Sequence, residues 1–415
     1  MDRSCCGPGR VTLVFRGGTP LAQTNNPNPL VIVATLGLSA GLGPASMTLV
    51  TPSLPAIETA LGVSSFMIAL AQSVFLFGLA VPQLVFGAFS DRFGHRPPLI
   101  VGMVLFVLGS LICMVTPNFA WLVVGRILQA IGASSGMVTS RALVRELYPT
   151  ERAAAMLGYM TVGIMVIPML APVAGGYIQS SIGWRGNFAL LTAISLLLVV
   201  TVTSMVPNVV SRRPPRPRST VEIYGRLLQS KAFRYFTWQV ILPSFLAQTF
   251  FASAPFVLEQ HYRLSPNSYG ALFAIPAIGF MMGNLTSGRL AERLGVNRMM
   301  GLGTAFTFIL SVPLAAIYLS GSLSVFWLFL LIGTLTFGHG LVVPSATASA
   351  TSALDTSFGS AAGMLGFLQF VLSGLGVLVL VPAASFGPAS IVGSYVLVSV
   401  ATFGMYLIRA VTRDT

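Results

Sequence analysis

The sequence has few charged residues and few cysteines, and both scarcities narrow what the chain can be. Only 8% of its 415 residues are charged, with ten acidic residues against 23 basic ones. A soluble protein of this length needs far more polar surface, so water is not the main solvent of this chain. Three cysteines, Cys5, Cys6 and Cys113, cannot form a disulfide framework, and Cys113 lies in an apolar run, as a small buried hydrophobic residue does.

The residue patterns of most enzymes and ATP-driven pumps are also missing. No paired carboxylates occur at membrane depth, and we find no His/Cys cluster with metal-ligand spacing, no Walker loop and no nucleophile elbow. We therefore predict no catalytic residue, no metal site, no cofactor and no enzymatic activity. The apolar run at 11–15 is too short for the core of a signal peptide, so residues 1–28 are predicted to form a mobile cytoplasmic tail.

Apolar residues are abundant, at 54% of the chain, and the mean hydropathy is +0.84. A helix needs about 20 mostly apolar residues to cross a bilayer. The chain has twelve such runs, at about 30–52, 66–88, 98–116, 119–141, 153–178, 187–206, 235–258, 268–290, 299–319, 323–346, 359–383 and 388–409. We predict an all-α integral membrane protein with twelve transmembrane helices.

A basic, proline-containing segment at 208–234 divides the spans into two groups of six. All basic residues except Arg126, Arg185 and Arg263 fall in segments that an even number of spans assigns to the cytoplasm, as the positive-inside rule expects. This distribution indicates contact with anionic lipid headgroups and argues against nucleic-acid binding. We predict a multi-pass protein of the cytoplasmic (inner) membrane with both termini cytoplasmic, divided into a tail at 1–28, a six-helix bundle at 29–207, a basic linker at 208–234, a second six-helix bundle at 235–410 and a tail at 411–415.

One short motif occurs once in each half. GAFSDRFG begins at Gly87 and GRLAERLG begins at Gly288, so both copies read Gly, three residues, an acid, Arg, one residue and Gly. Internal repeats of spans are typical of secondary transporters, and glycines permit the tight turn expected between spans. A solvated loop with basic anchors would need no second copy. We predict a conformational lock formed by Gly87, Asp91, Arg92, Gly94 and Arg96, with Arg141 and Arg145 at the end of the fourth span as partners of Asp91.

Two further motifs lie inside spans. Arg126, followed by Gln129, is a charged residue within the fourth span, where burial costs about 3 kcal/mol or more unless the charge is paired or hydrated. The position of Arg126 therefore predicts a functional site. The alternative is that Arg126 only donates hydrogen bonds to carbonyl groups and helps the helices to pack. In the fifth span, Pro172 removes one backbone hydrogen bond, which predicts a kinked helix. Three glycines of the same span, Gly163, Gly175 and Gly176, allow close helix approach. The kink either has a function in transport or serves packing alone.

These motifs resemble those of the major facilitator superfamily. Its hallmark loop reads GxxxDRxGRR, and this chain has GAFSDRFGHR, with His95 in place of the first paired arginine. Arg126 and Gln129 are similar to the RxxQG pattern of proton-coupled members, and APVAGG at 171–176 resembles the antiporter signature GPxxGG. The resemblance implies two pseudo-symmetric six-helix bundles, a loop that stabilises one conformation, and a role for Arg126 in proton transfer or substrate gating.

Three stretches resemble the Bcr/CflA-like group of twelve-span drug:proton antiporters: LGPASMTLVTPSLPAI at 42–57, ASAPFVLEQHYRLSPNSYGALFA at 252–274 and GSAAGMLGFLQF at 359–370. The first span departs from that group, because Thr48 stands where members commonly carry an Asp, and none of the ten acidic residues falls in mid-membrane. His339, in the tenth span, is the one histidine at depth, and histidine changes charge near neutral pH. A hydrogen-bonded core histidine is an equally good interpretation.

The substrate cavity is expected to be lined by neutral hydrogen-bonding and aromatic side chains, which suit amphipathic or neutral organic molecules better than permanent cations. The residues predicted to line it are Gln72, Trp238, Phe245, Gln248, Phe251 and Gln369. We predict a monomeric secondary transporter that exports drugs or small organic metabolites by alternating access in exchange for protons. An uncoupled facilitator or an importer is the alternative, since the first span lacks its acid, and a non-transporting membrane sensor is a more distant one.

Overall fold

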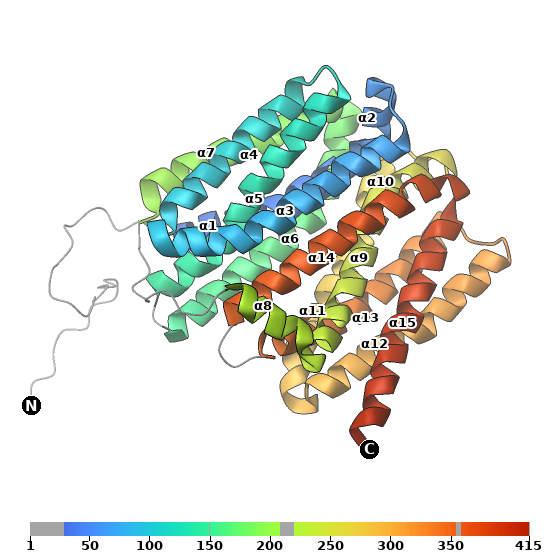
Figure 1. Cartoon of the computed structure of the whole chain (residues 1–415). Coiled ribbons are helices and arrows are strands. Elements are labelled where there is room, and N and C mark those ends of the chain that lie inside the picture. The colour runs from blue at the N-terminus through green and yellow to red at the C-terminus, as the bar shows by residue number, and fades with distance from the viewer. Residues whose placement is uncertain (1–28, 149, 208–219, 354–357, 415) are drawn as a thin grey trace, which may run out of the picture.

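The computed structural model describes residues 29–148, 150–207, 220–353 and 358–414 (Figure 1). The predicted tail at 1–28 and the start of the predicted linker lie outside these residues, as does Asp355. All regular structure in the described part of the chain is helical, as the composition predicted. Eleven helical segments there are long and apolar enough to cross a membrane, and α6 takes the remaining place in the series.

The first half consists of six spans. The first span is interrupted near its end by prolines and a short 3-10 turn, so it continues as α2 after α1. The elements are α1 (Pro29–Val50), η1 (Thr51–Ser53), α2 (Leu54–Leu61), α3 (Ser65–Phe93), α4 (Arg96–Val115), α5 (Phe119–Leu147), α6 (Thr150–Ile182) and α7 (Trp184–Met205).

The second half also has six spans, but here the interruption falls in the second span, which consists of α10 and α11. Several helices in both halves begin at a serine or asparagine whose side chain accepts a backbone N–H of the first turn, as at Ser64, Asn118 and Ser324. The elements are α9 (Lys231–Gln260), α10 (Pro266–Leu272), α11 (Ala274–Leu294), α12 (Val296–Leu319), α13 (Val325–Thr351), α14 (Phe358–Leu380), η2 (Pro382–Phe386) and α15 (Pro388–Asp414).

The linker contains a helix that the sequence analysis did not predict, α8 (Thr220–Gln229). Glu222 and Arg226 form an i,i+4 ion pair of 2.7 Å on its exposed side. Burial raises the pKa of Tyr224, on the same helix, above its usual value. The next helix begins at Lys231 rather than near 235, because the Ser230 side chain accepts the Phe233 N–H and starts α9 earlier.

The duplicated motif folds differently from the loop that we expected. The helix α3 continues through the motif to Phe93, and the turn is confined to Gly94 and His95. Gly94 has φ 83° and ψ 165°, and Gly295, its counterpart in the second copy, has φ 80° and ψ 152°. The last glycine of each copy is therefore the residue that needs a positive φ, while the residues before it continue the helix. Both copies end a span with the same backbone turn.

The two halves pack against each other mainly through α3 with α14 and through α6 with α10 and α11. We call the end of the molecule that carries α8 the linker end, and the opposite end, which carries α2, the distal end (Figure 1). Ser73 on α3 donates a hydrogen bond of 2.7 Å to the Gly374 carbonyl on α14, which joins the halves through a buried contact. The core is continuous across them.

Candidate functional site

Arg126 lies in the interior of the first half, where its side chain is 2% exposed. Its guanidinium donates to the Gln72 Oε1 at 2.6 Å, to the Gln129 Oε1 at 3.1 Å and to the Ser46 Oγ at 3.2 Å. Gln129 reaches Arg126 from three residues along α5, whereas Ser46 and Gln72 come from α1 and α3. The arginine therefore connects three spans.

The contacts continue to a fourth span. Gln129 donates through Nε2 to the Ser110 Oγ at 2.8 Å, and Ser110 donates to the Phe106 carbonyl at 2.8 Å within α4. We call Ser46, Gln72, Ser110, Arg126 and Gln129 the N-half network. Because buried hydrogen bonds have few alternatives in a membrane protein, movement of any one of these four helices requires the others to adjust.

The charge of Arg126 is stabilised by hydrogen bonds to neutral groups. No described carboxylate forms an ion pair with Arg126. Its guanidinium lies 4.0 Å from the centroid of the Phe75 ring, which adds a cation–π contact. The Nε2 of Gln72 is buried without an acceptor among the described residues. The network thus presents one positive charge and one unused donor to the low-dielectric interior.

Thr48, at the position where an acid was expected from the resemblance, bonds within its own helix. Its hydroxyl donates to the Pro44 carbonyl at 3.0 Å and is 5% exposed. Arg126 is reached from α1 by Ser46 instead, two residues earlier. A proton-coupling role for Thr48 stays a prediction.

His339 lies in the other half, on α13, and is 4% exposed. Its ring stacks on Tyr395 of α15 with 6.3 Å between ring centroids, and its Nε2 has no partner among the described residues. Tyr395 also lines a small space of about 10 Å³, together with four apolar side chains and the hydroxyl-bearing side chains of Thr249, Ser253, Ser390 and Ser394. That space is close to the smallest volume that holds one water, about 10–15 Å³. The histidine predicted at depth is therefore one residue removed from this space, which it reaches only through its stacking contact with Tyr395.

The residues predicted to line a cavity are placed in different surroundings. Gln72 belongs to the N-half network, and Phe251 lies among aromatic rings, 6.0 Å from the Phe250 centroid. Phe245 packs on Gly376 of α14. Gln248 and Gln369 are half-buried, whereas Trp238 is 44% exposed. The cavity role of these residues stays a prediction.

The glycines of the fifth span sit at close backbone crossings. Gly175 packs on the Leu49 carbonyl of α1, and a methyl group at Gly176 would lie 2.6 Å from the Pro266 carbonyl oxygen. Gly270 of α10 faces the Pro172 carbonyl in the same way, at 2.7 Å. Gly163 is helical, and its surroundings lie outside the described residues.

A hydrogen bond between the halves lies beside this crossing. The Tyr269 hydroxyl donates to the Pro52 carbonyl at 2.7 Å, and Tyr269 is fully buried. We call Pro52, Gly176, Tyr269 and Gly270 the distal contact. Both halves contribute to it, so it has to separate if the distal end opens.

The predicted lock is described in part. The side chains at Asp91 and Arg92 and the surroundings of Gly87 lie outside the described residues, so pairing of Asp91 with Arg141 or Arg145 stays a prediction. Arg141 and Arg145 are exposed in the last turns of α5. Arg96 donates to the Thr203 carbonyl near the end of α7, a contact within the first half.

Sequence reasoning missed several functional candidates that act from other spans. Ser46, Phe75 and Ser110 surround Arg126 and Gln129, and Tyr269 joins the halves. The i,i+3 spacing of Arg126 and Gln129 was the available signal, because it put both on one helix face. The other residues are ordinary apolar or small polar residues in apolar runs, and only the packing of the spans brings them to the site.

Relatives with similar sequences are described as transporters. The chain is 29% identical over 352 residues to the "Uncharacterized MFS-type transporter YdgK" of Bacillus subtilis (strain 168), covering 83% of this chain and 87% of that one. It is 24% identical to "Multidrug resistance protein D" of Escherichia coli (strain K12), over 86% of this chain and 89% of that protein. It is also 23% identical to the "Bicyclomycin resistance protein homolog" of Haemophilus influenzae (strain ATCC 51907 / DSM 11121 / KW20 / Rd), over 83% and 87%.

Solved structures share the fold at low sequence identity. A bacterial homologue of the human lysosomal transporter Spinster superposes with a TM-score of 0.70 at 16% identity, covering 93% of this chain and 96% of that one. A D-xylose-proton symporter superposes with a TM-score of 0.68 at 15% identity, over 90% and 96%. The sequence itself matches the Major Facilitator Superfamily over residues 36–377. The chain is therefore a multi-pass membrane transporter, not an enzyme, and it belongs to the Major Facilitator Superfamily, with relatives in the Bcr/CflA-like drug-efflux branch.

Proposed function

We propose that this transporter exports drugs or small organic metabolites across the cytoplasmic membrane by alternating access of its two halves, driven by inward movement of protons. The multidrug and bicyclomycin resistance relatives support export. The N-half network is the observation that carries the proposal, because it ties a buried charge to four of the six spans of one half. A change of ligand or proton occupancy near Arg126 then acts on the whole half.

The orientation follows from the basic residues. Arg145, Arg226, Lys231 and Arg409 all lie toward the linker end, whereas α2 with Glu58 lies at the distal end. By the positive-inside rule the linker end is cytoplasmic and the distal end faces outward. In this orientation the distal contact seals the outer side, and export requires its separation.

The substrate is a neutral amphipathic molecule in this proposal. A permanent cation entering the first half meets the charge of Arg126, which no described carboxylate balances. Two like charges about 4 Å apart in a medium of effective dielectric 20 repel by about 4 kcal/mol. A neutral molecule with a hydrogen-bond acceptor meets no such penalty and can use the spare Nε2 donor of Gln72.

Protons are carried by the second half in this proposal. We assign this role to His339, the buried histidine that stacks on Tyr395, because histidine is the side chain whose unperturbed pKa lies nearest neutral pH. It replaces the acid that Thr48 does not supply. Each proton moving inward across 100 mV releases about 2.3 kcal/mol, enough to concentrate a neutral substrate outside nearly fifty-fold.

A second candidate keeps the fold and changes the coupling. Thr48 has no titratable group, and its hydroxyl is used within α1, which favours an uncoupled facilitator or an importer. An exporter lowers the accumulation of its substrate in cells that express it, whereas an importer raises it.

Cells that express the protein distinguish these functions through accumulation of a neutral fluorescent amphiphile. Expression of the wild-type protein should lower steady-state accumulation relative to cells expressing Arg126→Gln, because the variant removes the charge that holds the N-half network together. The variant must reach the membrane in equal amount. Accumulation that rises with the wild-type protein supports the importer, and accumulation equal to that of the variant contradicts both transport candidates for this probe.

A further inference from the structure

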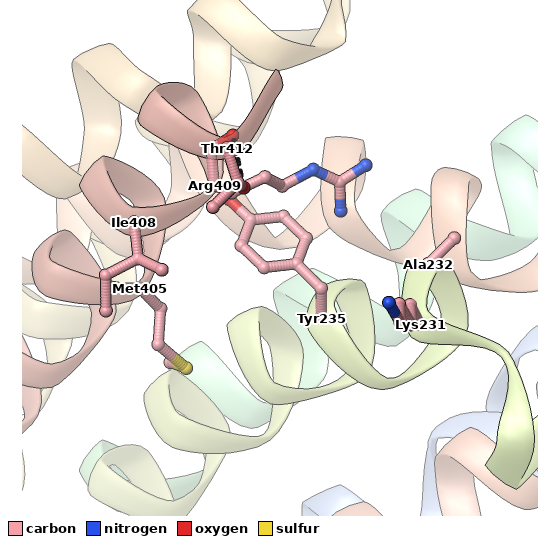
Figure 2. Close-up of a pocket in the computed structure, with 7 residues that line it drawn as sticks. All are labelled: Lys231, Ala232, Tyr235, Met405, Ile408, Arg409 and Thr412. Atoms are coloured by element: carbon pink, nitrogen blue, oxygen red, sulfur yellow. Dashed lines mark hydrogen bonds between the residues drawn. The ribbon is translucent and has the colours of Figure 1, made fainter. Parts of the chain in front are cut away.

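A cavity of about 470 Å³ lies at the linker end of the second half, away from the residues discussed above (Figure 2). It is formed between the first turns of α9 and the last turns of α15, and Lys231 and Arg409 line it together with Tyr235 and Met405. Small-molecule sites have volumes of about 300–1,000 Å³, so the cavity is large enough for a ligand, and because it is wide open to the surface it suits a group that enters from the side. The seven described residues of its lining include no Asp or Glu.

Arg409 is held in a defined orientation. Its guanidinium carbon lies 4.1 Å from the centroid of the Tyr235 ring and 4.4 Å from that of Phe236. Figure 2 shows the guanidinium extended across Tyr235, toward the side on which Lys231 and Ala232 lie. Stacking uses the faces of a guanidinium, and its N–H donors lie in the plane, where they match the oxygens of a phosphate.

Lys231 adds a second positive charge to the same cavity. It is the first residue of α9 and is exposed. The start of a helix carries a partial positive charge, which attracts anions independently of the side chain. Two basic side chains and a helix start therefore converge on one space, and the ligand that they favour is an anion.

An apolar stripe leads along α15 to the cavity. Leu397, Val400, Leu407, Ile408 and Val411 are each between 46% and 69% exposed and recur at helical spacing on one side of α15. Ile408 lines the cavity itself, beside Arg409. A positive cavity at the end of an exposed apolar stripe matches the arrangement of a phospholipid, in which a charged phosphate is followed by an acyl chain.

We propose that this cavity binds the headgroup of an anionic phospholipid, with Arg409 and Lys231 contacting the phosphate and an acyl chain lying along α15. The inference uses the orientation proposed above, because anionic lipids are concentrated in the cytoplasmic leaflet. The bound lipid bridges the first and the last span of the second half. It thereby holds the linker ends of α9 and α15 together during transport.

Lipid retention by the full-length protein tests this proposal. The protein in detergent is titrated with phosphatidylglycerol or phosphatidylcholine, and bound lipid is counted by native mass spectrometry. A basic residue at an anionic surface strengthens binding roughly five-fold. We expect Lys231→Gln to weaken phosphatidylglycerol binding about five-fold and the Lys231→Gln/Arg409→Gln double variant about 25-fold, if the two contributions add.

Arg234→Gln is the matched control, because Arg234 is an exposed basic residue three positions along α9 that does not line the cavity. Its binding should stay close to that of the wild-type protein. If the double variant does not fold because it loses the contact of Arg409 with the Tyr235 ring, the single variant Lys231→Gln still tests the proposal. Two results would overturn the proposal: phosphatidylcholine retained as well as phosphatidylglycerol, or Arg234→Gln weakening phosphatidylglycerol binding as much as Lys231→Gln does. Displacement of phosphatidylglycerol by equimolar glycerol 3-phosphate would also overturn it, because it would indicate a soluble phosphate ligand.

Discussion

Arg126 holds a positive charge in the interior of a membrane protein with the help of neutral acceptors alone among the described residues. Such an arrangement separates the chain from transporters that rely on an acid in the first span. Hydrogen bonds to a charged group contribute about 1.5–3 kcal/mol each. The arginine is therefore held firmly, and no described carboxylate neutralises its charge.

The charge near Arg126 can be cancelled by one substitution. Ser46→Asp places a carboxylate where the Ser46 hydroxyl now accepts from Arg126 at 3.2 Å. We expect this variant to admit cationic substrates and to raise efflux of tetraphenylphosphonium at least about tenfold, since tenfold corresponds to about 1.4 kcal/mol, only a part of the repulsion of about 4 kcal/mol in the proposed mechanism. Ser46→Asn has nearly the same shape without the charge and should leave cation efflux unchanged. Equal efflux in the two variants would show that the charge of Arg126 does not select the substrate.

The sequence predicted part of the site at the scale of single residues. Arg126 and Gln129 were recognisable, because a charge in an apolar run is costly and residues three apart share a helix face. Gln72 was predicted to line a cavity, yet its carbonyl oxygen accepts from Arg126. No pattern within α1 distinguishes Ser46 from its neighbours Ala45 and Met47, since its role depends on where a different span crosses.

At the scale of elements, the duplicated turn depends on one glycine in each half. Gly94→Ala and Gly295→Ala place a side chain in an extended backbone conformation with positive φ that is nearly exclusive to glycine, which costs about 1–3 kcal/mol. Both variants should lower the melting temperature in detergent by a similar amount. Gly288→Ala is the control, because Gly288 lies inside α11 with open space around its Cα, and alanine there should be neutral or stabilising by up to about 1 kcal/mol. A larger loss in Gly288→Ala than in Gly295→Ala would contradict this view of the motif.

The crossing of α6 and α10 gives a second prediction for an element. In Gly176→Ala the added methyl group would meet the Pro266 carbonyl at 2.6 Å, so the distal contact has to loosen. We expect faster labelling of a cysteine introduced at Ser53, which is buried beside this contact. Gly158→Ala, on the same helix with nothing within 4 Å, should leave labelling unchanged. Unchanged labelling in Gly176→Ala would mean that the crossing does not seal the distal end.

Elements were predicted well where they cross the membrane and less well between spans. Length and hydropathy located the spans because about 20 apolar residues in succession have few other uses. The helix α8 was missed, since its charges and the prolines before it are typical of an extended linker, and its apolar residues act only by packing on α9 and α14. The motif after the second span was expected to be a loop, because sequence alone does not show which glycine ends the helix.

At the scale of the whole molecule, two similar six-span halves meet along α3 and α14 and at the distal contact. The motif that begins at Gly87 and again at Gly288 reflects this duplication in the sequence. In the proposed mechanism the two halves have different roles: Arg126 in the first half interacts with the substrate, and His339 in the second half carries the proton. In that mechanism alternating access couples the two residues, because the halves move against each other at the contacts that join them, such as the Tyr269–Pro52 hydrogen bond.

Efflux from liposomes containing only the purified protein tests the central claim most directly. An inward proton gradient should drive outward transport of a neutral amphiphile in the wild-type protein, with proton uptake in step. His339→Gln should retain gradient-independent exchange of substrate while losing proton uptake. Transport by the wild-type protein that is indifferent to both the pH gradient and the membrane voltage would contradict proton-coupled export.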